Sequence, residues 1–364
     1  MKNILFVCNT HYQLIVAIQM RLTLMEETSA SVLVTNRSKG AEEIAKRLRD
    51  TAIFDQVFFQ EVHEPQGRSA SFLERFSLIK QGVFGTRLYK TNKHTVFDEI
   101  VGFNFDLHSH AVFANEYKKN RHITCEKMEE GLLSYATKED SSGVLSTIYK
   151  LRRLLRRKNM RHLPTRFYCF QPSAYNGKLT ASPIPKLVHS DEKIKSVLSS
   201  VFIDTSQART NYTEKYIFLP CIYDKEGGKP IGELTLATRL ADTVGKDNLL
   251  VKVHPRDDAE RYRAAGLHVD TSSAVPWEVI QINHNFSDKV LLSTLSTSLL
   301  STCSLFELPP KSFYLYPLCD LSANPLATHY KGVVEDYISK ADVLALKNLE
   351  VCSTLSSLTS TRKE

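Results

Sequence analysis

Short apolar runs, separated by amphipathic stretches, recur along the whole chain. Runs rich in valine, isoleucine, leucine and phenylalanine, bounded by polar or glycine-containing turns, are typical of buried strands in a parallel sheet. We predict strands at residues 4–8, 31–35, 57–59, 99–103, 111–113, 123–125, 216–219, 248–253, 268–269, 289–292 and 313–315. Apolar positions at helical spacing predict helices at residues 14–25, 40–49, 144–161, 231–244 and 299–305, and from 336 onward. Strands that alternate with helices indicate an α/β fold.

The segment 171–190 interrupts this alternation. It is rich in proline, serine, asparagine and glycine, a composition that favours an exposed linker. A chain of 364 residues has room for two domains of ordinary size. We therefore predict an N-terminal Rossmann-like domain at residues 1–185 and a C-terminal one at residues 186–364.

The strand predicted at 248–253 ends in His254, which is followed by Pro255. Proline cannot continue the hydrogen-bond ladder of a strand, so the strand should stop there. In open α/β sheets the carboxyl ends of the strands line the ligand site. His254 is then an ionisable ring at a strand tip, with Arg256 two residues further on to meet an anion. The alternative is a histidine that caps a helix or packs in the core.

Two further polar segments follow strands of the same domain. The loop after residues 216–219 contains two acids, Asp224 and Glu226. The strand at 289–292 leads into a hydroxyl cluster before a predicted helix, and its members are Ser293, Thr294, Ser296, Thr297 and Ser298. Hydroxyls and backbone N–H groups at a helix start form a ready phosphate site. A serine in this position also serves as an ordinary helix cap.

Polar residues follow the first strand of the N-terminal domain as well. Asn9, Thr10, Tyr12 and Gln13 stand where a Rossmann-like fold binds its ligand. The glycine-rich dinucleotide fingerprint is missing from this turn, so a dinucleotide cofactor has no support. The alternative reading is a plain turn in which Asn9 and Thr10 cap the following helix.

A pair of acids follows the strand predicted at 123–125. Glu129 and Glu130 precede Gly131, and a turn of this kind can place one carboxylate on the ligand side of the sheet. Adjacent acids are also common on solvated surfaces, where they begin a helix.

Basic residues are concentrated in the predicted helix at 144–161, in a chain whose formal charge is +7. They are Lys150, Arg152, Arg153, Arg156, Arg157, Lys158 and Arg161. A basic amphipathic helix is typical of proteins that lie on anionic lipid surfaces. No nucleic-acid motif accompanies it, and a merely solvated basic face is the alternative.

The seven cysteines are scattered and form no Cys-x-x-Cys pair. This pattern excludes a disulfide framework and a cysteine zinc site, and it suits a reducing compartment. The apolar stretch at the N-terminus is too short for a signal peptide, and no run reaches the length of a membrane span. We expect a cytoplasmic protein, at most peripherally attached to a membrane.

Several catalytic motifs are missing from the sequence, among them Asp-x-Asp, the Walker loop, Gly-x-Ser-x-Gly and His-Glu-x-x-His. Their absence disfavours metal-dependent nucleotide-sugar enzymes, NTPases, hydrolases and metalloproteases. We expect an anion site without a metal, built from His254, Arg256 and the amides of a helix start.

Four short motifs, in this order, resemble the bacterial lipooligosaccharide sialyltransferases. They are residues 4–14, Glu129-Glu130-Gly131, His254-Pro255 and Ser296-Thr297, the second being similar to a motif shared among bacterial sialyl- and polysialyltransferases. The resemblance implies a GT-B fold, with two Rossmann-like doubly wound domains facing a cleft. It implies inverting, metal-independent transfer of sialic acid from CMP-sialic acid to a terminal galactose of lipooligosaccharide or a similar surface glycan. It also implies a homodimer that associates peripherally with the inner membrane.

The resemblance assigns the donor to the C-terminal domain and the acceptor to the N-terminal domain. The expected donor-binding residues are His254, Pro255, Arg256, Trp277, Glu278, Ser293, Ser296, Thr297 and Ser298. The expected acceptor-binding residues are Asn9, Thr10, Tyr12 and Gln13. His254 is suited to stabilise the departing phosphate of CMP as a proton or hydrogen-bond donor, and no cofactor is expected.

Inverting displacement also needs a carboxylate that takes the proton of the acceptor hydroxyl. Asp224 is the first choice, because its loop resembles the acidic loop of the family. The chain departs from the family there, since an extra Gly227-Gly228-Lys229 leaves Glu226 eligible too. Glu129 and Glu130 are the rivals from the other domain.

Two other classes of function stay open. One is a related GT-B transferase with another nucleotide-linked donor, such as a glucosyl or polyol-phosphate donor. The other is a non-catalytic protein that binds a membrane surface through the basic helix. Binding of CMP, CDP or UDP would distinguish these classes.

Overall fold

A computed structural model describes residues 1–62, 71–86, 95–103, 106–136, 143–203, 211–254, 256–270, 275–342 and 346–360. The chain divides into two compact units, which we call unit 1 and unit 2. Unit 1 comprises Met1–Glu130, Thr137–Pro172 and Gly177–Pro185, and unit 2 comprises Gly131–Ala136, Ser173–Asn176 and Lys186–Glu364. The two short segments of unit 2 that come from the first half of the chain were not expected from the sequence.

Unit 1 is built on a seven-stranded sheet in which every paired strand is parallel. In sheet order its strands are β3 (Gln56–Gln60), β2 (Ser29–Thr35), β1 (Asn3–Cys8), β4 (Glu99–Gly102), β5 (Thr124–Met128), β6 (Arg166–Cys169) and β7 (Thr180–Pro183). The central strand β1 buries both faces, since Ile4 through Cys8 are all at most 2% exposed. Continuous apolar runs of this kind are required where helices cover both faces of a sheet.

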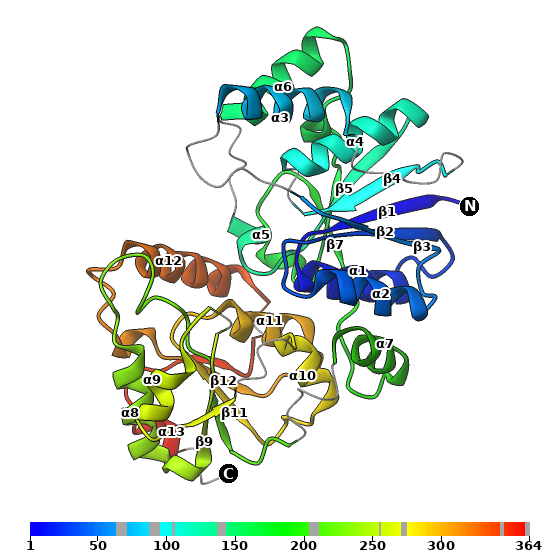
Figure 1. The fold of residues 1–364 in the computed structure, drawn as a ribbon. Helices are drawn as coiled ribbons and strands as arrows, with labels where there is room; N and C mark the ends of the chain where they lie inside the picture. Colours follow the sequence, from blue (N-terminus) through cyan, green and yellow to red (C-terminus); the bar gives the residue numbers. More distant parts are fainter. Residues whose placement is uncertain are drawn as a thin grey trace. The chain divides into compact units, whose positions relative to one another are not determined.

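The helices of unit 1 lie on both faces of this sheet, with α1 and α2 on one side and α3, α4 and α6 on the other (Figure 1). They are α1 (His11–Leu22), α2 (Ala41–Asp50), α3 (Phe72–Phe84), α4 (Leu107–Lys119) and α6 (Gly143–Leu154), followed by the 3-10 turn η1 (Met160–His162). Side-chain caps set three of the starts, because Thr10, Ser71 and Asp106 each accept a bond from a backbone N–H of the first turn.

Two sequence predictions in unit 1 are wrong. Residues 111–113, predicted as a strand, lie inside α4, whose middle is buried on all sides and therefore shows no helical periodicity. The predicted helix at 144–161 ends at Leu154, and Arg156 follows with a positive φ of 52° that no helix continues. Its Arg152, expected on a solvated face, is fully buried.

Unit 2 repeats the plan with a six-stranded sheet whose paired strands are all parallel. In sheet order its strands are β10 (His268–Asp270), β9 (Leu249–Lys252), β8 (Tyr216–Phe218), β11 (Val290–Ser293), β12 (Lys311–Tyr314) and β13 (Leu349–Val351). Its helices are α5 (Leu133–Ala136), α7 (Glu192–Phe202), α8 (Glu233–Val244), α9 (Ala259–Ala264), α10 (Trp277–Asn283), α11 (Thr297–Leu305), α12 (Pro325–Lys340) and α13 (Ser357–Ser360). Three 3-10 turns complete the description, η2 (Pro172–Ala174), η3 (Lys246–Asn248) and η4 (Tyr316–Leu318).

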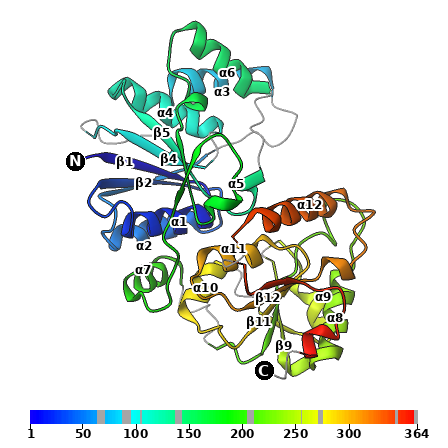
Figure 2. The ribbon, with the colours of Figure 1, turned by 180° about the vertical axis from the view of Figure 1, so that it is seen from behind.

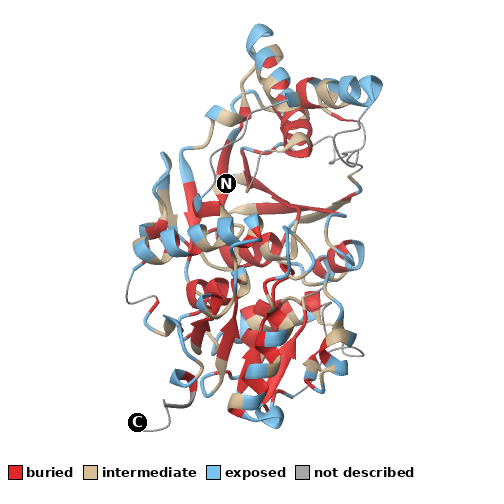
Figure 3. Cartoon of the chain, turned by 90° about the vertical axis from the view of Figure 1, so that its left-hand side faces the viewer, coloured by how far each residue is buried: buried red, intermediate tan, exposed pale blue. Residues whose placement is uncertain are grey.

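One core of unit 2 packs α8 on its sheet. Phe218, Val251, Leu292 and Phe313 come from four neighbouring strands, and Leu240 comes from α8. Figure 2 shows the strands of unit 2 from behind, and Figure 3 shows the strands of both sheets largely buried. The chain adds β9 and β10 on one side of β8 and then returns to add β11 on the other side. The order of the strands therefore reverses between β8 and β11. Ligands of open α/β sheets bind at the carboxyl edge of such a reversal.

Candidate active site

The carboxyl edge of the unit 1 sheet brings together the polar residues that follow β1. The backbone N–H of Asn9 donates to Gln13 Oε1 at 2.6 Å, and Asn9 Oδ1 accepts from Thr35 Oγ1 at 3.0 Å. Thr10 caps α1 by accepting from the N–H of Gln13 at 3.2 Å. Thr10 can cap α1 and still belong to a ligand site, because the turn that contains it faces the end of β5.

The adjacent acids after β5 have different surroundings. Glu129 is buried, and its two carboxylate oxygens accept from Tyr12 Oη at 2.7 Å and from the N–H of Phe170 at 2.8 Å. Glu130 is only partly buried, and the Gln13 and Thr10 side chains donate hydrogen bonds to it. Burial raises the pKa of Glu130 to about 7, against these bonds, which lower it. A carboxyl with this pKa can exchange a proton near neutral pH.

Two charged residues of this edge had not been predicted. Arg37 follows β2 and pairs with Asp106 at 2.6 Å, and Asp106 in turn lies 3.5 Å from Asn9 Nδ2. Both residues follow strand ends by a few positions, so the rule that strand ends carry function could have found them. Both residues act on Glu130, since Arg37 lowers its pKa and Asp106 raises it.

His254 lies just beyond β9 at the carboxyl edge of the unit 2 sheet. Its Nδ1 accepts from the backbone N–H of Arg256 at 3.1 Å, and its carbonyl accepts from the N–H of Asp257 at 2.8 Å. Burial lowers the pKa of His254, and Arg256 lowers it further, while Asp257 and Glu226 oppose the shift. The neutral ring with Nδ1 as acceptor carries its hydrogen on Nε2. Pro255 lies outside the described residues.

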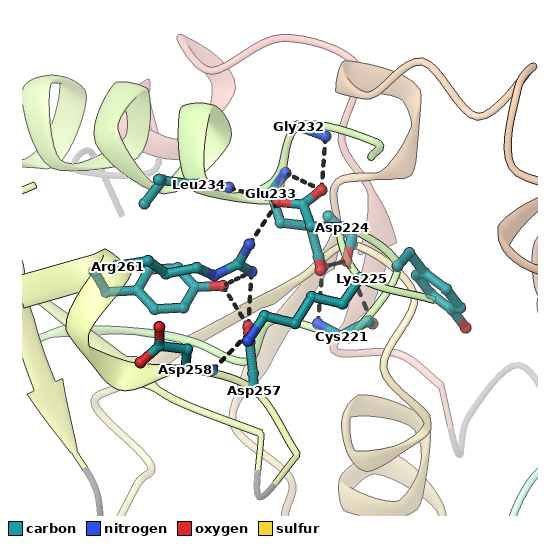
Figure 4. A network of polar contacts seen from close by, with 12 residues as sticks. Cys221, Asp224, Lys225, Gly232, Glu233, Leu234, Asp257, Asp258 and Arg261 are labelled. Atoms are coloured by element: carbon teal, nitrogen blue, oxygen red, sulfur yellow. Dashed lines mark hydrogen bonds and ion pairs between the residues drawn. The ribbon is translucent and has the colours of Figure 1, made fainter. Parts of the chain in front are cut away.

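Asp224, the first choice for the base, has a different task. Figure 4 shows its carboxylate at the first turn of α8, where it accepts from the N–H groups of Gly232, Glu233 and Leu234 at 2.9, 3.1 and 3.3 Å. Arg261 contacts the same carboxylate at 3.0 Å. A carboxylate with this many donors and a side chain 7% exposed is an anchor of α8, and it is poorly placed to take a proton from an acceptor.

The network around Asp224 also fixes the loop that carries His254. Asp257, whose side chain is 0% exposed, lies 3.1 Å from Lys225 and 2.7 Å from Arg261 (Figure 4). Lys225 belongs to the loop after β8, and Asp257 to the loop after β9. Their ion pair therefore ties together two strand-end loops of one sheet edge.

Glu226 is the other acid of the loop after β8. It forms an exposed ion pair with Arg256, with Nη1 at 3.0 and 3.3 Å from the two carboxylate oxygens. Buried Asn324 holds this loop, because its Nδ2 lies within 3.0 Å of the carbonyls of Tyr223, Glu226 and Lys229. The loop after β8 is thus linked to the His254 region by the ion pair between Glu226 and Arg256.

The extra glycines of this loop have a packing reason. A Cβ at Gly227 would lie 2.7 Å from Asn324 Oδ1, and one at Gly228 would lie 2.6 Å from the carbonyl of Ala323. Their φ angles of +86° and +145° also exclude most other residues. Both glycines therefore fit closely against the segment that contains Asn324.

The hydroxyl cluster after β11 contains both anchors and a helix start. Ser293 is buried and donates to the carbonyl of Leu219 at 2.7 Å, and Thr294 donates to Glu233. Ser296 caps α11 by accepting from the N–H of Ser298 at 3.2 Å, and Thr297 at the first position of the helix is exposed. Ser296 and Thr297 are therefore the members of the cluster at the start of α11, while Ser293 joins β11 to β8.

Trp277 and Glu278, assigned to the donor from the sequence, are both buried. The indole N–H of Trp277 donates to Thr302 at 3.1 Å, and its ring packs against Phe286. Glu278 accepts from Ser301 at 2.8 Å, and burial raises the pKa of its carboxyl. These contacts explain both residues by packing within unit 2, and a donor contact by them stays a prediction.

Within the described ranges, no group of three or more His, Cys, Asp and Glu side chains is arranged to hold a metal ion. The described part of the chain also contains no helix with the length and apolar character of a membrane span.

Two α/β units, each built on a parallel sheet, form a GT-B fold. Among solved structures, an alpha/beta-galactoside alpha-2,3-sialyltransferase from the luminous marine bacterium Photobacterium phosphoreum matches with a TM-score of 0.54. The identity is 11%, and the match covers 98% of this chain and 100% of that chain. Acinetobacter baumannii MurG matches at 0.43 with 11% identity, covering 100% and 91%, and S. aureus MnaA at 0.46 with 13% identity, covering 99% and 95%.

The chain belongs to the alpha-2,8-polysialyltransferase family, whose model matches residues 4–315. No curated protein matches the sequence. The prediction of a sialyltransferase family and of a glycosyltransferase is thereby confirmed. The matching family is described by polysialyl transfer and not by lipooligosaccharide, so the narrower part of the resemblance stays a prediction.

Proposed function

We propose that this protein transfers sialic acid from CMP-sialic acid to the terminal galactose of a lipooligosaccharide or a similar surface glycan, with inversion and without a bound metal. The observation that carries the proposal is Glu130, a partly buried acid with a pKa of about 7 at the end of β5. An acid of this kind is matched to accepting a hydroxyl proton near neutral pH.

The donor half of the reaction is assigned to unit 2. CMP leaves as a phosphate that needs stabilisation of negative charge and little protonation. His254, with its hydrogen on Nε2, donates a hydrogen bond to that phosphate in our proposal. Arg256 and the start of α11 at Ser296 and Thr297 add positive potential for the same anion. This proposal accounts for four of the predicted donor residues.

The acceptor half is assigned to unit 1. Glu130 removes the hydroxyl proton of the acceptor while the new glycosidic bond forms to the sugar carbon and the bond to CMP breaks. Thr10 and Gln13, which donate to Glu130, orient its carboxylate. Glu129 supports the site through Tyr12 and does not act as the base. Glu226 remains the rival base of unit 2, because its carboxylate is partly exposed.

A transfer assay tests the proposal directly. The purified protein is incubated with CMP-sialic acid and a lactose-terminated fluorescent acceptor, and the product is identified by mass and by linkage-specific sialidases. UDP-glucose and a CDP-linked polyol serve as the donors of the alternative transferases. A product with one of these donors and none with CMP-sialic acid would overturn the donor assignment.

A second acceptor is favoured by the family match. The family description names alpha-2,8-linked polysialic acid, so the acceptor sugar of this chain is in that case sialic acid itself. The same assay with a sialyllactose-terminated acceptor decides the question. Faster transfer to sialyllactose than to lactose would favour the second acceptor.

We also propose where the protein works. In this proposal the protein is a homodimer that is attached peripherally to the cytoplasmic face of the inner membrane. A lipid-anchored acceptor and a soluble donor meet at that surface, which supports the location on chemical grounds.

A further inference from the structure

The N-terminal half of α3 is exposed on every side. Each residue from Ser71 to Ser77 is exposed, including three large apolar side chains. Phe72 is 81% exposed, Leu73 77% and Phe76 61%. The helix is well formed there, because Ser71 and Glu74 make a capping box, with bonds of 3.3 and 2.7 Å to each other's backbone N–H.

The apolar face of α3 extends beyond the helices that cover it. Phe72, Phe76, Ile79 and Val83 follow helical spacing and share one face. Val83 is buried where α3 packs on α4 and α6, two helices that Figure 1 shows next to α3. Towards the N-terminus the same face is left to solvent. An exposed apolar surface of this size marks an interaction site.

The exposed charges of α3 and α6 are mostly positive. Arg75 and Lys80 of α3 are exposed, and α6, which packs on the C-terminal end of α3, is accompanied by exposed Lys150, Arg153 and Arg156. Glu74 is the only acidic residue in α3 and α6 together, and it is used in the capping box. Apolar side chains with a basic surrounding fit an anionic partner with an apolar interior.

We propose that the N-terminal half of α3 binds an anionic lipid bilayer, with Phe72, Leu73 and Phe76 entering the interface between headgroups and acyl chains. The basic residues of α3 and α6 then contact lipid phosphates. A helix exposed on all sides suits lipid, which closes around any shape, whereas a protein partner would need a matching groove. The proposal rests on the membrane location proposed above, and it replaces the expectation that the helix at 144–161 is itself the lipid-binding element.

Vesicle binding tests the proposal apart from catalysis. The parent and a Phe72→Gln/Leu73→Gln/Phe76→Gln variant are floated with vesicles of phosphatidylglycerol and phosphatidylcholine, and with phosphatidylcholine alone. Glutamine keeps the helix propensity, and all three sites are exposed, so the fold should persist. Leu308→Gln is the matched control, because Leu308 is 68% exposed in unit 2.

The expected result is at least tenfold weaker binding of the triple variant to anionic vesicles, with the control unchanged. A Phe72→Trp variant should also be quenched by brominated acyl chains, whereas buried Trp277, the single native tryptophan, should not be. Unchanged vesicle binding of the triple variant overturns the proposal. A triple variant that loses self-association and keeps vesicle binding also overturns it, in favour of a second copy of the chain. Transfer to a soluble acceptor is measured in parallel, so failure of the transferase assignment would be seen separately.

Discussion

Glu129 and Glu130 are neighbours in the chain, and their environments separate them into two roles. Glu129 is buried and accepts from Tyr12 and Phe170, whereas Glu130 is only partly buried and accepts from the Gln13 and Thr10 side chains. Changing Glu130 to Gln should lower kcat by about 100-fold to 10,000-fold, the usual range for a lost general base, with little effect on donor binding. Steady-state kinetics with CMP-sialic acid measure both. A variant with normal kcat would remove Glu130 from the reaction and leave Glu226 as the base.

The same carboxyl predicts a pH dependence of activity and of stability. The rate should fall as pH drops below about 7, because Glu130 must be ionised to accept a proton. Its pKa is higher in the folded chain than the 4.5 of an ordinary glutamate, so the folded state holds the proton more tightly. Stability is therefore lost as pH rises from 4.5 through about 7. In thermal unfolding, Glu130→Gln should melt higher than the parent at pH 8 and equally near pH 4.

His254 is expected to act as a neutral hydrogen-bond donor. Since Nδ1 accepts from the Arg256 amide and burial lowers the pKa, the ring should be uncharged at pH 7.5 with its hydrogen on Nε2. His254→Ala should lose at least about 100-fold in turnover. His254→Gln should lose less, because the glutamine amide places an N–H near the position of Nε2. Nitrogen NMR of the labelled ring checks the tautomer, and a hydrogen found on Nδ1 would contradict the assignment.

At the scale of elements, the adjacent residues Arg152 and Arg153 of α6 have different surroundings. Arg152 is buried, whereas Arg153 is exposed. The Arg152 side chain lies within 3.3 Å of the carbonyls of Gly82, Val83 and Lys158, and it stacks on Phe113. Loss of the guanidinium removes three hydrogen bonds to buried or partly buried backbone carbonyls, of which that of Val83 also accepts from Arg157, so Arg152→Gln should cost at least about 2 kcal/mol in the free energy of unfolding. Arg153 is exposed, and Arg153→Gln should cost less than about 0.5 kcal/mol. Urea unfolding of the two variants measures the difference. Equal stabilities would contradict a stabilising role for the bonds that Arg152 donates to the three carbonyls.

The strands that form the sheet centres could be predicted from the sequence because they are buried on both faces. Residues 4–8 are a continuous apolar run and residues 249–253 are apolar except for Lys252, and such runs have few alternatives. Among the elements that were missed are α3, which mixes exposed apolar residues with polar ones, the short edge strand β13, and β7, which lies in the segment predicted as a linker. The strand pattern predicted the place of His254 just after β9, and its role in the reaction stays a prediction. The cap that Asp224 forms on α8 was not predicted, because it depends on a fold of the loop that no local pattern specifies.

At the scale of the whole molecule, donor binding and metal dependence can be predicted together. CMP should raise the melting temperature of the parent more than CDP or UDP at equal concentration, because binding to the folded state stabilises it. His254→Ala should reduce the CMP effect.

Transfer should continue in excess EDTA, and the assay is repeated with added Mg²⁺ as a control. Complete loss with EDTA that Mg²⁺ restores would show that a metal is required.

The segment Gly131–Ala136 belongs to unit 2 although the chain around it builds unit 1. Tyr135 of α5 packs edge-on against Tyr337 of α12 with ring centroids 5.0 Å apart, and Ser304 bonds Tyr337 from α11. A fragment that starts at residue 186 would therefore lack α5, which packs on α12 within unit 2. During synthesis on the ribosome, the first sheet is complete once Pro183 has emerged, long before α12 exists. Until α12 has been synthesised, α5 lacks its contact with Tyr337, so this short helix completes its packing only when the last third of the protein has been made.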